Sequence, residues 1–85
     1  MRAQRNHEMR DTILRAWYEY YQASGIGPSY KELMTLTEIG STSTIHRYIS
    51  MLAEADLIRY QPGKPRTVTL TTAGREYLEG MVVHD

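Results

Sequence analysis

The chain has 85 residues, enough for one small domain with a thin hydrophobic core. Its hydrophobic share of 41% and charged share of 24% exclude a disordered tail, and the lack of cysteine excludes disulfides, Cys-ligated zinc and a thiol nucleophile. Ten basic and ten acidic residues give zero net charge, so any nucleic-acid binding must depend on a sided distribution of charge.

The first predicted element is a helix over about residues 6–24, where apolar residues recur at spacings of three and four. Gly25 ends it, and Gly27-Pro28 then enforces a turn. The residues expected to face the core are Met9, Ile13, Leu14, Trp17 and either Tyr20 or Tyr21.

A second, short helix is predicted from Tyr30 to about Leu36. Ser29 and Glu32 have the spacing of a capping box, in which each side chain binds the other residue's backbone amide. Leu33 and either Leu36 or Met34 should be buried, and residues 37–40 form a tight connection.

A third helix should begin in the run Ser41-Thr42-Ser43-Thr44, because a hydroxyl there can cap the free amides, and end near residues 55–56. Ile45, Ile49 and Leu52 give its buried stripe. Two helices joined by so short a connection are typical of a helix-turn-helix.

A β-hairpin follows, with strands predicted over residues 57–61 and 67–71 and a loop at 62–66 that contains two prolines. Thr72 should cap a last helix over residues 73–80. The predicted fold is mainly α with a small hairpin, a winged helix-turn-helix with a three-helix core, a wing and a short C-terminal helix. We expect a single domain over residues 1–85, with its core at about 6–71 and the C-terminal helix and tail at 72–85.

The polar side of the third helix is the candidate DNA-reading surface, because a helix fits the major groove and reads bases with its first turns. Arg47 suits a bidentate pair with guanine, and His46 can donate to a base or a phosphate. The competing interpretation is a capped helix start with solvated hydroxyls. The candidate residues on this helix are Ser41, Thr42, Ser43, Thr44, His46 and Arg47.

The hairpin loop is the second candidate contact. Pro62 and Pro65 stiffen it, Gly63 permits a sharp turn, and Lys64 and Arg66 add two positive charges. Such a wing can contact the phosphate backbone or enter the minor groove. The alternative is a solvated turn whose charges only aid solubility.

The sequence contains no arrangement of residues that indicates an enzyme active site. His7, His46 and His84 lie on separate elements, without partners at metal-ligand spacing, and no phosphate-binding glycine loop follows a strand. We therefore expect no catalytic residues, metal, cofactor or small-molecule ligand. No apolar run approaches the roughly 20 residues of a membrane span, and the start has no secretory pattern, so we expect a cytoplasmic protein that is bacterial, phage-encoded or nucleoid-associated.

Residues 9–70 resemble the amino-terminal DNA-binding domain of LexA repressors. The resemblance lies in GPSxxE at residues 27–32, STSTIHRYISML at 41–52, Leu57-Ile58-Arg59, and PGKPR at 62–66. It implies a winged helix-turn-helix that represses transcription by binding an operator in double-stranded DNA. Base contacts would come from Ser41, Ser43, Thr44, His46 and Arg47, and backbone contacts from Lys64 and Arg66.

The chain departs from this family in three respects. Glu38 stands where the family has glycine, so the turn should be shaped differently, with Gly40 taking over. The family's self-cleaving, dimerising domain is missing, so the chain is either a small regulator or a piece of a larger repressor. Residues 72–78 resemble instead the helix after the wing in other winged-helix regulators.

Two further surfaces remain as hypotheses. A homodimer would favour a palindromic site, with the last helix as the interface. In the alternative function, the winged helix binds another protein rather than DNA and uses Tyr18 and Tyr21. The candidate dimer contacts are Tyr77, Leu78 and Met81.

Overall fold

The structure is a computed structural model that describes residues 2–64 and 66–83, with side chains described for residues 7–64 and 66–81. The predicted order of three helices, a hairpin and a last helix is confirmed. The elements are α1 (Arg2–Ser24), α2 (Tyr30–Thr37), α3 (Thr42–Glu54), β1 (Ile58–Arg59), β2 (Thr69–Leu70) and α4 (Thr72–Val83).

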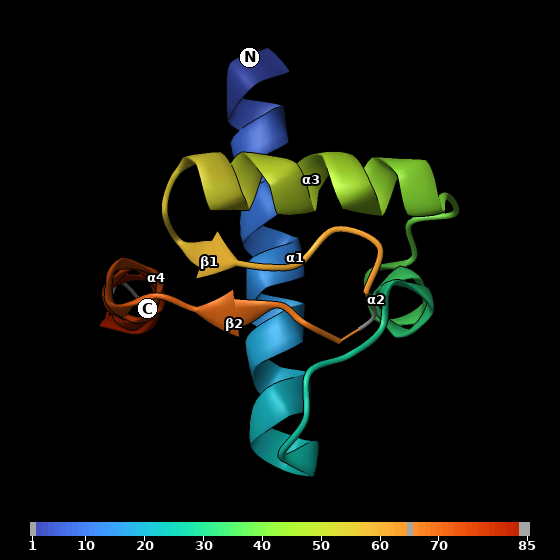
Figure 1. Cartoon of the computed structure of the whole chain (residues 1–85). Helices are drawn as coiled ribbons and strands as arrows, with labels where there is room; N and C mark the ends of the chain where they lie inside the picture. The colour runs from blue at the N-terminus through green and yellow to red at the C-terminus, as the bar shows by residue number, and fades with distance from the viewer. Residues whose placement is uncertain (1, 65, 84–85) are drawn as a thin grey trace.

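The helices α2 and α3 pack against the long helix α1, and α3 crosses it steeply (Figure 1). The two strands form an antiparallel hairpin in which Ile58 pairs with Leu70 and Arg59 with Thr69. The loop between them extends toward α2, whereas α4 lies beside the opposite end of the hairpin (Figure 1). Across the described residues, none of the helices has the length and apolar character needed to cross a membrane.

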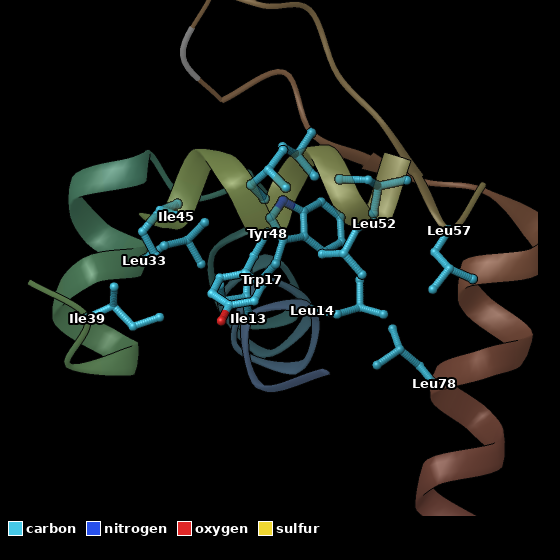
Figure 2. Packing of buried hydrophobic residues seen from close by; sticks show 13 residues of the cluster. Ile13, Leu14, Trp17, Leu33, Ile39, Ile45, Tyr48, Leu52, Leu57 and Leu78 are labelled. Atoms are coloured by element: carbon cyan, nitrogen blue, oxygen red, sulfur yellow. The ribbon is translucent and has the colours of Figure 1, made fainter. Parts of the chain in front are cut away.

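The hydrophobic core lies between α1 and α3 and is closed by α2 at one end and α4 at the other (Figure 2). The predicted stripe of α1 is buried at Ile13, Leu14 and Trp17, whereas Tyr21 is 45% exposed. In α2, Leu33 is buried and Met34 joins the core, while Leu36 is 50% exposed. The predicted stripe of α3, Ile45, Ile49 and Leu52, is buried together with Tyr48.

The strands are much shorter than predicted, with two residues each instead of five. Beyond Arg59 a side chain replaces the backbone ladder: the amide of Gln61 donates to the hydroxyl oxygen of Thr67 at 2.9 Å. The Thr67 hydroxyl in turn lies within bonding distance of the carbonyl oxygens of Gln61 (3.2 Å) and Lys64 (3.0 Å). The loop is therefore tied together by Thr67 rather than by strand pairing.

The last helix begins one residue earlier than predicted, because Thr71 rather than Thr72 caps it. The Thr71 hydroxyl accepts a hydrogen bond from the amide of Gly74 at 2.9 Å and donates to the carbonyl of Asp56 at 2.6 Å. This one side chain therefore caps α4 and fixes it to the segment that precedes β1.

Contacts with α1 also hold α4 in place. The Tyr77 hydroxyl donates to the Asp11 carboxylate at 2.8 and 2.9 Å, and the guanidinium of Arg10 lies over the Tyr77 ring at 5.6 Å. Leu78 is buried in the core. The last helix is thus an integral part of the folded unit.

The turn between α2 and α3 corrects the expectation that Gly40 would take over from Glu38. Glu38 itself adopts the left-handed conformation at the end of α2, with φ 60° and ψ 24°. The backbone of Gly40 has no positive φ. The turn therefore keeps a left-handed position at Glu38, at a steric cost to a residue that has a Cβ atom.

Replacing Glu38 with glycine should stabilise the fold by about 0.5–1 kcal/mol, because glycine adopts positive φ without that cost. The free energy of unfolding, measured by urea denaturation, checks this. Gly40→Ala, at a neighbouring turn position with open space and no positive φ, is the matched control and should also stabilise by about 0.4–1 kcal/mol, because there alanine rather than glycine is the favourable residue. A Glu38→Gly variant no more stable than the parent would show that the left-handed turn is unstrained.

Candidate nucleic-acid interface

The start of α3 presents hydroxyl groups to solvent, as the DNA-reading hypothesis requires. Ser41 is extended, with φ −144°, and its hydroxyl oxygen accepts the amide of Thr44 at 3.3 Å, so it caps the helix. Thr42 and Ser43 are exposed, and Thr44 is half-buried. Of these four residues, Thr42 and Ser43 are the most accessible to a partner.

One turn further along, His46 and Arg47 are also exposed. They lie between Ile45 and Tyr48 in the sequence, and both of those residues are buried in the core, so α3 has one packing side and one polar side. The Arg47 guanidinium lies over the Tyr48 ring, 5.8 Å from its centroid. This contact supports the stem of the side chain, and the guanidinium remains accessible on an exposed residue.

An aromatic group that the sequence did not point to surrounds His46. Its ring lies 6.1 Å from that of Tyr30 on α2 and 6.2 Å from that of Tyr60 at the base of the wing. The hydroxyl of Tyr60 also forms a hydrogen bond of 3.2 Å with the hydroxyl of Ser50 on α3. Partial burial, together with the nearby Tyr60, raises the pKa of Tyr30. The polar face of α3 is therefore joined to both α2 and the wing.

We define the wing as the loop of residues 60–68. Its tip carries Lys64, which is exposed, and the amide of Lys64 donates to the carbonyl of Gln61 at 3.2 Å. Gly63 has a φ of +77°, as the predicted sharp turn requires. Lys64 therefore projects its charge from a loop with internal hydrogen bonds, as predicted.

Arg66 is exposed like Lys64, but its guanidinium is paired within the chain instead of projecting freely. Its guanidinium donates to both carboxylate oxygens of Glu32, at 2.9 and 3.2 Å, and to the carbonyl of Gly27 at 2.9 Å. The predicted capping box of Ser29 and Glu32 is confirmed, so the same carboxylate also accepts the Ser29 amide at 2.8 Å. The bond from Ser29 and the bonds from Arg66 lower the pKa of Glu32 to about 2.

Sequence reasoning missed the second role of Glu32 because its partner lies 34 residues away. The only available signal was chemical: a capping-box carboxylate uses one oxygen on the helix and leaves the other free to accept a cation. Tyr60 was missed because a single aromatic after a short strand gives no indication of which helix it will contact.

The proposed dimer contacts are largely occupied within the chain. Leu78 is 5% exposed, the Tyr77 hydroxyl binds Asp11, and the sulfur of the half-buried Met81 lies 3.9 Å from a guanidinium nitrogen of Arg15. A dimer through α4 remains a prediction, and only Tyr77 and Met81 have exposed area to offer it.

The aromatic surface of the alternative hypothesis is partly accessible. Tyr21 stacks on Trp17 with ring centroids 5.1 Å apart, and the hydroxyl of the half-buried Tyr18 accepts a hydrogen bond from Gln22 at 2.9 Å. Within the described residues, no group of three or more His, Asp or Glu side chains has the arrangement of a metal site.

Comparison with known proteins identifies similarity to LexA repressors. The chain is 33% identical over 75 residues to the LexA repressor of Ligilactobacillus salivarius and 38% identical over 66 residues to that of Lactiplantibacillus plantarum. It is 32% identical over 74 residues to that of Enterococcus faecalis. These alignments cover 88%, 78% and 87% of the chain, but only 36%, 31% and 35% of the repressors.

The chain thus spans about a third of the length of these relatives. No protein-family model matches it, and no solved structure matches it significantly. The resemblance to LexA repressors that the motifs indicated is confirmed.

Proposed function

We propose that this LexA-like chain is a sequence-specific double-stranded DNA-binding module of a transcriptional repressor, and that it has no catalytic activity. In this proposal the polar side of α3 enters the major groove, and the wing lies along the adjacent backbone or minor groove. The module would act in the bacterial cytoplasm, where the DNA is, and a homodimer would place two such helices on a palindromic site.

The observation that carries the proposal is the exposed polar face of α3 beside a cationic wing. Thr42, Ser43, His46 and Arg47 are exposed on the same helix whose other side is buried. The hydrogen bond between Tyr60 and Ser50 joins the base of the wing to that helix, which supports a shared surface for Lys64 and the polar face. Short hydroxyl side chains and an arginine suit base edges, and a lysine suits phosphate.

The proposal is tested by selection from a pool of random-sequence duplexes, followed by a salt titration of the selected and random duplexes. We expect a preferred sequence and an affinity for both duplexes that falls steeply as salt rises, by a slope of about −0.9 per phosphate contact. Two half-sites in the selected sequence would support a dimer. The absence of any duplex binding at low salt would refute the proposal.

A protein-contact function is the second candidate, favoured by the zero net charge and by Tyr21, which stacks on Trp17 at the surface. The selection experiment separates the two functions, because a winged helix that binds only proteins enriches no duplex sequence. In that case Tyr21→Ser should abolish the protein contact, while Thr42→Ala, on the face assigned to DNA, should leave it intact.

A further inference from the structure

We propose that Arg66 is a positioning residue that clamps the wing onto the start of α2, and that Lys64 alone carries the charge of the wing to the DNA backbone. This inference rests on the proposed DNA-binding function. It assigns different roles to two neighbouring cations that sequence reasoning treated alike.

Arg66 is engaged by groups of its own chain. Its guanidinium forms three hydrogen bonds of 2.9–3.2 Å, two of them to the ionised carboxylate of Glu32 and one to the carbonyl of Gly27. The side chains of Arg66 and Glu32 are 40% and 36% exposed, so the contact owes its strength to its planar, two-pronged geometry rather than to burial. To reach a phosphate, Arg66 would have to give up this contact.

Glu32 is held in place by contacts that do not involve Arg66. The Glu32 carboxylate accepts the amide of Ser29 at 2.8 Å, and the Ser29 hydroxyl accepts the amide of Glu32 at 3.1 Å. The acceptor is therefore held at the first turn of α2 by local structure alone. When the flexible side chain of Arg66 binds this fixed carboxylate, the loop that carries Arg66 becomes ordered.

The wing is not held in place by strand pairing, so it needs contacts with the helices to keep its position. The backbone ladder ends at the pair Arg59–Thr69, and Thr67 ties the loop only to itself. Tyr60 anchors the outgoing end of the loop to Ser50 on α3, and Arg66 anchors the returning end to α2. Lys64 lies between these two anchors and is thus held relative to the helix-turn-helix.

The backbone at Arg66 fits this role. Its φ of 62° is left-handed, a conformation that costs energy for any residue with a Cβ atom. Such a conformation persists only where the surroundings fix it, and the three guanidinium bonds provide that fixation. Lys64 has no ion pair among the side chains that the structure describes, so its charge is available to DNA.

The first test uses the full chain and the duplex recovered by the selection, with three variants. We expect Arg66→Ala to bind roughly tenfold more weakly at one salt concentration but to keep the parent's salt slope, because it loses wing order rather than a phosphate contact. Arg66→Lys keeps the charge but not the two-pronged contact, so it should also bind more weakly than the parent. Lys64→Ala should lower the slope by about 0.9.

Arg75→Ala, which removes an exposed arginine on α4, is the matched control for loss of one charge. A salt slope for Arg66→Ala that is reduced as much as that of Lys64→Ala would overturn the proposal, and so would Arg66→Lys binding as tightly as the parent. Either result would make Arg66 a phosphate contact.

The second test needs no DNA, so it separates failure of the clamp from failure of the proposed function. In the free protein, hydrogen exchange of the Lys64 amide, which donates to Gln61, should be roughly tenfold faster in Arg66→Ala than in the parent. Amides in the middle of α3 should exchange as before, which shows that the fold is intact. Unchanged exchange at Lys64 would overturn the clamp, whatever the duplex experiments show.

Discussion

Replacing Gly74 with alanine is expected to destabilise the fold by about 2–3 kcal/mol, a large effect for so small a change. A Cβ atom at Gly74 would collide with the carbonyl oxygen of Leu57 and lie 2.9 Å from its carbonyl carbon and 3.1 Å from Cδ2 of Leu70. The Leu57 carbonyl cannot move aside freely, because it accepts the amide of Thr71 at 3.2 Å. The helix α4 would have to shift away from the core.

Gly80→Ala is the control for this prediction, since both residues lie in α4. A Cβ atom at Gly80 meets nothing within 4 Å, so alanine there should stabilise the fold by up to about 1 kcal/mol through helix propensity alone. Thermal and urea unfolding of both variants give the two free-energy changes. If both variants change the free energy of unfolding in the same direction, the close approach of Gly74 to the Leu57 carbonyl would be contradicted.

Arg47→Ala should cost about 1–3 kcal/mol of discrimination at one base pair, because a bidentate arginine–guanine pair contributes that much. The measurement compares binding to the selected duplex with binding to duplexes changed at each position in turn. Preference should be lost at one position only. Because Arg47 is exposed and its guanidinium lies over the Tyr48 ring, stability should change little.

Two control variants show whether the effect of Arg47→Ala comes from the loss of base recognition. Arg47→Lys keeps the charge but cannot form the same planar pair, so it should keep the salt slope and lose most of the preference. Thr35→Ala, at an exposed position of α2, should alter neither quantity. A loss of affinity that is uniform across all duplexes would reassign Arg47 from base recognition to backbone contact.

The elements that could be predicted from sequence are those fixed by neighbours in the chain. The capping box of Ser29 and Glu32 is local, and both of its bonds are present. The stripe of Ile45, Ile49 and Leu52 follows from helical spacing, and it leaves His46 and Arg47 on the outer face. The exposure of Thr42, Ser43, His46 and Arg47 could therefore be predicted from one short stretch.

The failures concern contacts between distant residues or backbone strain. The bond between Arg66 and Glu32 depends on how far the hairpin folds back, which no local pattern encodes. The short strands follow from Thr67 binding Gln61, a contact that a β-branched strand pattern conceals. Glu38 adopts a glycine-like conformation because the packing of α2 and α3 fixes the turn, whichever residue occupies it.

The contact between α1 and α4 limits how far the chain can be shortened from its C-terminal side without losing the fold. Arg10 is only 9% exposed, and the groups that face it there are the Asp11 carboxylate, 3.7 Å from its Nε, and Tyr77. A fragment that stops after β2 would keep the buried cation but lose the aromatic ring above it and the cover that Leu78 gives the core. We therefore expect the smallest fragment of this chain that folds to retain the sequence through Met81.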